Sequence, residues 1–194
     1  MGLIAGVDEA GRGPWAGPVV VAAVILDANK PIEGLDDSKK LSPKKRDILY
    51  DQIVQNAHSY SFKFIGVPLI DRTNILQATL MGMERVVTAL PLLPDEVLID
   101  GRDKPKLPTK ARAIIGGDAS ENSIAAASIV AKVLRDRYMQ RLDIKYPEYG
   151  FASHKGYGTK AHQTALEQHG VLIHHRKSYA PIKKIITALE GNYE

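Results

Sequence analysis

The chain has 194 residues, a formal net charge of +4 and no cysteine, so disulfides, thiolate nucleophiles and cysteine-ligated zinc are all excluded. The longest apolar run, residues 18–26, is too short to cross a bilayer, and no secretory signal pattern opens the chain. We therefore expect a cytoplasmic protein with no membrane partner. Residues 101–194 hold 16 Lys and Arg against 9 Asp and Glu, which favours a polyanionic partner.

Three β-type runs lie early in the chain, and two of them are rich in β-branched or aromatic residues. They are residues 3–7, 18–26 and 60–67. Between the second and the third, Ser42 followed by Pro43 has the pattern of a helix N-cap and first turn. The side chains predicted to form the inner face of that helix are Ile48, Leu49 and Ile53.

The next helix is predicted to begin after Thr73 or Asn74, since either residue can cap it. Its apolar residues recur at steps of three and four, which is typical of a buried helix face. They are Leu76, Leu80, Met83, Val87 and Leu90.

The second half of the chain begins with two short apolar strands, residues 97–99 and 113–115, joined by a polar loop that prolines interrupt. A long helix over residues 123–142 is predicted to be buried in its first half, and Pro181 opens a last helix. This order of strands and helices indicates an α/β fold with one mixed sheet covered by helices. We expect residues 1–194 to form a single domain, with a C-terminal helical segment from about residue 181, and the protein to be a monomer.

Four acidic residues lie at, or just past, the ends of predicted strands: Asp8, Glu9, Asp100 and Asp118. Sites in open α/β sheets gather at the carboxyl ends of strands, so we expect these carboxylates to converge. Converging carboxylates repel one another unless hard cations neutralise them, and oxygen-only ligands select Mg²⁺ or Mn²⁺ over zinc. Two such ions assist phosphodiester hydrolysis. Taken singly, Asp100 and Asp118 are more typical of turn residues.

Two glycines, Gly11 and Gly13, flank Arg12 directly after the first acidic pair, and without a Cβ they let backbone N–H groups approach a ligand. The string from Gly11 to Ala16 also matches a relaxed dinucleotide-binding motif, but that motif needs a helix next, and a strand is predicted there. No Walker A loop or H-E-x-x-H pair occurs. We therefore expect no nucleotide cofactor and no zinc site.

These motifs together resemble the bacterial ribonuclease HII family, the type 2 ribonucleases H, from Gly6 to about Leu189. Their order and spacing agree with the family throughout. The segments that carry the resemblance are Gly6–Pro14, Asp37–Ser42, Leu98–Gly101, Gly117-Asp118, Ala125–Val133 with Arg135-Asp136, and His154–Thr159. The resemblance implies a ribonuclease H-like fold, with a central mixed sheet of about five strands flanked by helices.

The resemblance also implies an endonuclease that cuts the RNA strand of RNA–DNA hybrids. Such enzymes nick 5′ of ribonucleotides embedded in duplex DNA and leave 3′-hydroxyl and 5′-phosphate ends. Metal-ion-assisted hydrolysis with Mg²⁺ or Mn²⁺ is implied, and ribonucleotide removal is the implied cellular role. The residues that match the family's catalytic and metal-binding acids are Asp8, Glu9, Asp100 and Asp118.

For substrate binding, the resemblance assigns Gly11, Arg12 and Gly13 to the loop that senses the 2′-hydroxyl at the RNA–DNA junction, largely through backbone groups. Tyr157 matches the tyrosine that stacks on the next deoxyribose, although alone it reads as an ordinary half-buried tyrosine. Phosphate contacts are predicted for Ser38, Lys39, Lys40, His154, Lys155, Arg176 and Lys177. Taken singly, each lysine is more typical of a solvated surface charge.

Two other functions stay open from the sequence. A nuclease or recombinase of the same fold would use similar acids but cut DNA alone. A noncatalytic nucleic-acid-binding module would bind without turnover, but four acids without a metal would repel phosphate.

Overall fold

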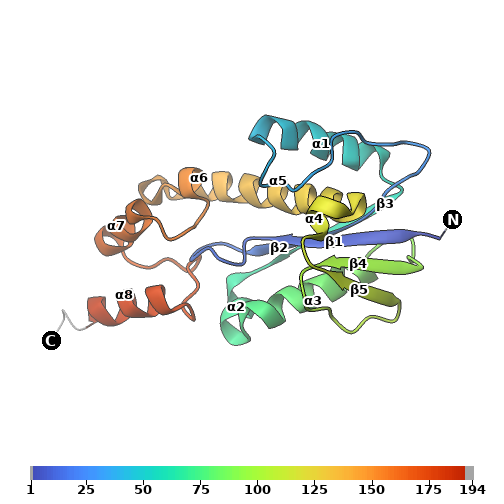
Figure 1. The fold of residues 1–194 in the computed structure, drawn as a ribbon. Helices are drawn as coiled ribbons and strands as arrows, with labels where there is room; N and C mark the ends of the chain where they lie inside the picture. The colour runs from blue at the N-terminus through green and yellow to red at the C-terminus, as the bar shows by residue number, and fades with distance from the viewer. Residues whose placement is uncertain (1, 191–194) are drawn as a thin grey trace.

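A five-stranded mixed sheet with helices on both faces forms the centre of the computed structural model, which describes residues 2–190 (Figure 1). The strand order is β3-β2-β1-β4-β5. The strands are β1 (Ile4–Ala10), β2 (Val19–Ile25), β3 (Ser59–Ile65), β4 (Glu96–Asp100) and β5 (Lys110–Ile114). Strand β2 is antiparallel to both of its neighbours, whereas β1, β4 and β5 run parallel. The predicted mixed sheet is confirmed.

The helices lie in three groups (Figure 1). On one side of the sheet are α1 (Pro43–Asn56), α4 (Gly117–Ser120) and α5 (Asn122–Lys145), and on the other are α2 (Val67–Arg72) and α3 (Ile75–Thr88). Beyond the far end of α5 lie the short 3₁₀ turn η1 (Pro147–Tyr149), α6 (Phe151–His154), α7 (Lys160–His169) and α8 (Ala180–Glu190). Among the helices of residues 2–190, none combines the length and the apolar character that crossing a membrane requires.

Alternating side chains of the strands build an apolar core on each face of the sheet. On the α3 face, the fully buried residues include Ala5, Val7, Val97 and Ile99. On the α5 face, Val20, Ala22 and Val24 pack with the alanines of α5. Gly6 lets α5 lie directly on β1, because a Cβ at that position would overlap the backbone of Ser123.

The helix starts follow the predicted capping pattern, but one buried position, one strand end and two helices differ from the prediction. Ser42 caps α1 by accepting from the Lys45 N–H, and Asn74 rather than Thr73 caps α3. Ile48 is 51% exposed, so its predicted place on the inner face of α1 is wrong. The third strand ends at Ile65, and the short helix α2, like α7, was not predicted.

Candidate active site

Strand β1 continues through its acidic pair. Its antiparallel pairing with β2 places Asp8 opposite Ala22 and Glu9 opposite Val21. The prediction that this pair follows a strand end is therefore wrong, because hydrogen bonds from β2 keep the chain extended beyond Val7. In an extended strand neighbouring side chains point to opposite faces, so Asp8 and Glu9 diverge.

The parallel register of β1 and β4 brings Asp8 beside Asp100. Val7 lies opposite Ile99, and both side chains belong to the core on the α3 face. The next residue of each strand therefore turns to the α5 face. Two carboxylates that lie more than ninety positions apart in the sequence thus become neighbours on one surface of the sheet.

The third carboxylate comes from a helix. Asp118, predicted at the end of a strand, lies in the first turn of α4, beyond the end of β5. The Gly117 N–H donates to Asp100 Oδ1 at 2.8 Å, which joins α4 to the end of β4. This hydrogen bond sets Asp118 beside the carboxyl end of β4, where Asp100 lies.

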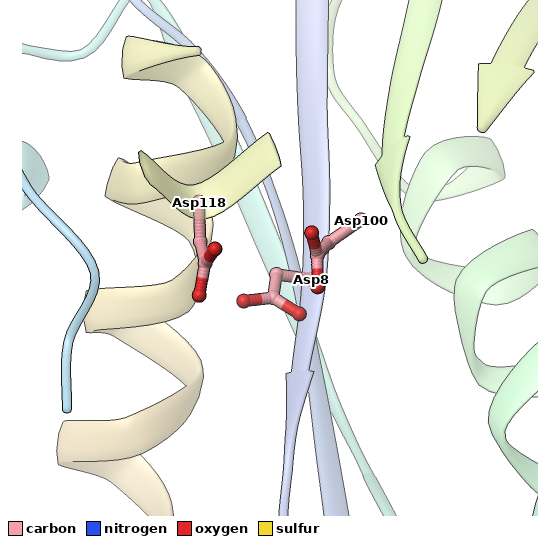
Figure 2. A group of neighbouring side chains, drawn as sticks. All are labelled: Asp8, Asp100 and Asp118. Carbon is pink, nitrogen blue, oxygen red and sulfur yellow. The ribbon is translucent and has the colours of Figure 1, made fainter. Parts of the chain in front are cut away.

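Figure 2 shows the three carboxylates of Asp8, Asp100 and Asp118 turned toward one space, with Asp8 between the other two. One oxygen of each carboxylate lies within 4.8 Å of an oxygen of both others. In the part of the chain that the structure describes, this is the one such group of three or more Asp, Glu, His or Cys side chains. The oxygen-only donor set fits a hard divalent cation.

The surroundings disfavour negative charge on these groups. Burial raises the pKa of Asp8 well above its ordinary range, and the charges of Glu9 and Asp100 raise it further. Burial, followed by the charge of Asp100, also raises the pKa of Asp118. A bound cation would supply the positive charge that this cluster lacks.

Glu9 lies outside the group of three. Its Oε1 is 3.5 Å from Nη1 of Arg12, and while burial raises the pKa of Glu9, Arg12 opposes that shift. Glu9 nevertheless lines the same cavity of about 450 Å³ as Asp8 and Asp100.

The segment before α1 places one positively charged side chain beside the acids. Nζ of Lys39 lies 3.7 Å from Oδ2 of Asp118, and this lysine side chain is 78% exposed at the rim of the cavity. Ser38 lines the cavity too, but it is buried and accepts a hydrogen bond from Ser128 Oγ at 2.7 Å. Lys40 pairs with a neighbouring acid outside the cavity lining.

Arg176 requires the largest correction. The sequence predicts that it contacts phosphate, but its side chain is fully buried. Its guanidinium donates to the carbonyl oxygens of Gly11 (2.6 Å), Arg12 (2.7 Å) and Gly17 (2.9 Å). Within residues 2–190 it has no carboxylate partner. Arg176 therefore binds the protein's own glycine-flanked loop and is out of reach of a nucleic acid.

This contact decides where the loop's N–H groups point. Because the C=O and N–H of a trans peptide point in opposite directions, drawing two carbonyls toward Arg176 turns the N–H groups of Arg12 and Gly13 away from it. Neither N–H finds an acceptor among the described residues. Gly11 has φ +97°, and a Cβ there would overlap the Arg135 side chain, so the loop requires glycine at this position. Two backbone donors are thereby left free in the loop that lines the acidic cavity.

Tyr157 lies across from this loop. This residue is 48% exposed, it lines the same cavity as Asp8, Glu9 and Asp100, and a Cβ on Gly13 would lie 3.5 Å from its Cε1. The structure therefore places an exposed aromatic ring next to the free N–H groups.

Three backbone segments are joined behind the loop and Tyr157. The Trp15 N–H donates to the carbonyl of Gly156 (2.8 Å), and the Trp15 carbonyl accepts from the Arg176 N–H (2.8 Å). The Gly17 N–H donates to the carbonyl of His174 (2.9 Å). Residues 15–17 thus connect the tyrosine's loop with the segment that carries Arg176.

Two other predicted phosphate contacts are engaged inside the protein. His154 Nδ1 accepts from the Gly156 N–H (3.1 Å), and its Nε2 donates to the Tyr149 carbonyl (2.7 Å), so both ring nitrogens are occupied. To contact substrate through a ring nitrogen, as predicted, His154 would have to release one of these bonds. Lys155 Nζ donates to the Ala152 carbonyl (2.5 Å) and would have to release it to reach a phosphate.

Arg135 lines the cavity; it lies within a segment of the family resemblance, but no role at the site is predicted for it from the sequence. It is 1% exposed and donates to the carbonyls of Ala16 (3.2 Å) and Pro18 (3.1 Å), and burial lowers its pKa to about 10. Besides that resemblance, its sequence signal is its place directly after the apolar half of the long helix. Buried and exposed arginines are otherwise alike in a sequence.

Comparison with known proteins gives consistent results for fold and family. The family model described as Ribonuclease HII matches residues 5–181. A "Ribonuclease HII" of Aliivibrio fischeri is 53% identical over 184 residues, covering 95% of this chain and 89% of the relative. One from Vibrio parahaemolyticus is 55% identical, covering 95% and 87%. Among solved structures, ribonuclease H2 from Pyrococcus horikoshii is 27% identical with a TM-score of 0.83, covering 96% of this chain and 98% of its own.

Proposed function

Because the chain belongs to the ribonuclease HII family and is therefore an endoribonuclease that acts on RNA–DNA hybrids, we propose that its reaction takes place at Asp8, Asp100 and Asp118. The observation that carries this proposal is the convergence of three carboxylates, from β1, β4 and α4, within 4.8 Å. Glu9, on the wall of the same cavity, is proposed as the fourth acid.

The proposed cofactor is Mg²⁺ or Mn²⁺, held by these carboxylates. When bound, such ions supply the positive charge that activates water and stabilises the leaving oxygen of the phosphodiester. The protein's part is to hold the acids in place: the β1–β4 register fixes Asp8 beside Asp100, and the Gly117 N–H holds α4 against Asp100. Lys39, exposed beside Asp118, is proposed to contact a substrate phosphate.

We propose that the enzyme nicks 5′ of a ribonucleotide embedded in DNA, leaving 3′-hydroxyl and 5′-phosphate ends. The free N–H groups of Arg12 and Gly13 are suited to donate to a 2′-hydroxyl, the group that distinguishes RNA from DNA. Tyr157, next to Gly13, is proposed to stack on the following deoxyribose. A single catalytic domain over residues 1–194, a monomeric state and a cytoplasmic location stay predictions from the sequence.

A labelled DNA duplex that carries one ribonucleotide tests this function directly. With Mg²⁺ or Mn²⁺ we expect one nick, 5′ of the ribonucleotide, and with EDTA we expect none. The control is the same duplex made entirely of DNA, which should stay intact. Equal cleavage of both duplexes would instead favour a nuclease that acts on DNA, and binding without cleavage would favour a noncatalytic module.

Substituting Tyr157 tests the proposed stacking. Tyr157→Ala should weaken cleavage at the single ribonucleotide by about five- to a hundredfold in kcat/KM, because a stacking contact contributes on the order of 1–3 kcal/mol. Tyr157→Phe keeps the ring and should stay within about threefold of the parent, since the proposed stacking depends on the ring and not on the hydroxyl. The measurement is kcat/KM on the single-ribonucleotide duplex and on a uniform RNA–DNA hybrid. Unchanged values for Tyr157→Ala on both substrates would contradict the stacking role.

A further inference from the structure

Three histidines from separate segments form a buried cluster behind Tyr157. His154 ends α6, His162 lies in α7, and His175 directly precedes Arg176. The rings of His154 and His162 stack with centroids 4.4 Å apart, and those of His162 and His175 are 5.2 Å apart. His162 and His175 are fully buried, and the proposed chemistry uses none of the three.

The hydrogen bonds of this cluster determine which nitrogen carries each proton. The Leu172 N–H donates to His175 Nδ1 at 2.9 Å, so that nitrogen is unprotonated. Burial lowers the pKa of His175 to about 3 and that of His162 to about 4, so both rings are neutral at pH 7. The proton of His175 is therefore on Nε2.

His162 continues the chain of hydrogen bonds with the same donor-to-acceptor direction. His175 Nε2 lies 3.0 Å from His162 Nε2, a contact that needs one donor and one acceptor. Because His175 donates, His162 accepts at Nε2 and carries its own proton on Nδ1. That Nδ1–H lies 2.9 Å from the carbonyl oxygen of Tyr157 and donates to it.

This arrangement excludes a metal site at the cluster. Both nitrogens of His162 and both of His175 are engaged in the chain of hydrogen bonds. His154 uses its two nitrogens on Gly156 and Tyr149. Across the described residues, the three rings thus keep no lone pair for an ion.

We propose that His162 and His175 are positioning residues for Tyr157, acting through one directed chain of hydrogen bonds from the Leu172 N–H to the Tyr157 carbonyl. This proposal rests on the stacking role of Tyr157 proposed above. Tyr157 is an exposed residue, so its ring depends on its backbone for its place. The Tyr157 carbonyl accepts from His162 and from the Thr159 N–H (2.9 Å), and its N–H donates to the His154 carbonyl (2.9 Å). The chain of histidines joins this peptide to the segment that carries Arg176. The same segment therefore holds both the backbone of Tyr157 and the glycine-flanked loop.

Nitrogen-15 NMR of the histidine rings in the whole protein tests the chain without reference to activity. At pH 7 we expect His175 as a neutral ring protonated at Nε2, and His162 as a neutral ring protonated at Nδ1. Resonances are assigned with His162→Asn and with His58→Gln, a substitution at an exposed histidine outside the cluster. An Nε2-protonated His162, or a charged ring at either His162 or His175, would overturn the proposal.

Paired variants test the link to Tyr157. His162→Asn keeps an amide donor near the place of Nδ1, whereas His162→Gln keeps a polar group near Nε2 and loses the donor to Tyr157. For His162→Gln, the ratio of kcat/KM on the single-ribonucleotide duplex to that on a uniform hybrid should fall about three- to tenfold, the factor of one ordinary hydrogen bond. His162→Asn should restore at least half of the parent ratio.

Destabilisation alone would lower both rates together and leave this ratio unchanged. A parent-like ratio in folded His162→Gln would therefore contradict the positioning role, even with the expected NMR result. Failure of the stacking proposal is distinguishable, because Tyr157→Ala would then also keep the parent ratio.

Discussion

Asp8→Asn should abolish cleavage while leaving the fold intact. Asparagine keeps the shape of the side chain but removes the negative charge that the central member of the acidic cluster offers to a cation. Metal ions contribute several kcal/mol of transition-state stabilisation, so we expect kcat to fall by about a thousandfold or more. The measurement is single-turnover cleavage of the one-ribonucleotide duplex at saturating Mg²⁺.

The same substitution should make the metal-free protein more stable. The folded-state pKa of Asp8 is raised above its unfolded value, so this group favours the folded state at acidic pH and loses that contribution as pH rises through the folded pKa. At pH 7 the Asp8 carboxylate is therefore a cost to folding that asparagine removes. In EDTA, we expect the melting temperature of Asp8→Asn to equal or exceed that of the parent.

With Mg²⁺ added, the parent should have the higher melting temperature of the two proteins. Ligand binding at a hundred times Kd stabilises a protein by about 2.7 kcal/mol, and this gain should be largely absent from Asp8→Asn. Asp51→Asn, an exposed position on α1, is the matched control and should behave like the parent in both assays. Full-rate cleavage by folded, metal-saturated Asp8→Asn would remove Asp8 from the mechanism.

Arg176→Met should destabilise the protein by about 3–5 kcal/mol, because methionine fills much of the space but leaves the carbonyls of Gly11 and Gly17 without a donor in the interior, while the Arg12 carbonyl keeps only the Tyr179 hydroxyl. Preference for the ribonucleotide junction should fall as well, since the N–H groups of Arg12 and Gly13 lose their fixed direction. Urea unfolding followed by circular dichroism measures the first effect, and the ratio of rates on the two substrates measures the second.

Two variants control for charge and for the neighbouring arginine. Arg176→Lys keeps the charge but cannot reach three carbonyls with one nitrogen, so its stability should lie between parent and Arg176→Met. Arg12→Ala removes an exposed side chain and should cost less than about 1 kcal/mol. If Arg176→Met unfolds within about 1 kcal/mol of the parent, the guanidinium is not what holds the loop.

Three of the acidic residues lie together as predicted from the sequence, but for Asp8 the structural explanation behind that prediction was wrong. Asp8 and Asp100 were expected together because sites lie at strand ends, yet Asp8 lies inside β1 and meets Asp100 through the register of parallel strands. Register depends on which strands pair, which a single sequence does not state. The opposite orientation of Glu9 follows from the same continuation of the strand.

Arg176 and His154 show what a prediction based on charge alone leaves out. Arg176 and His154 were assigned to phosphate because basic residues near a predicted nucleic-acid site usually face it. In the structure their donors satisfy backbone carbonyls of the protein itself. Composition reports charge but not its partner. Arg176 is buried against carbonyls about 160 positions away in the chain, and the partners of the partly buried His154 lie within five positions.

The backbone links between residues 15–17, Gly156 and residues 174–176 have a consequence for how substrates are chosen. These links hold the loop of the free N–H groups and the segment of the tyrosine ring at a set separation. If both groups contact neighbouring sugars as proposed, that separation is matched to one sugar-to-sugar step, and the nucleic acid, more than the protein, would have to bend or twist to fit it.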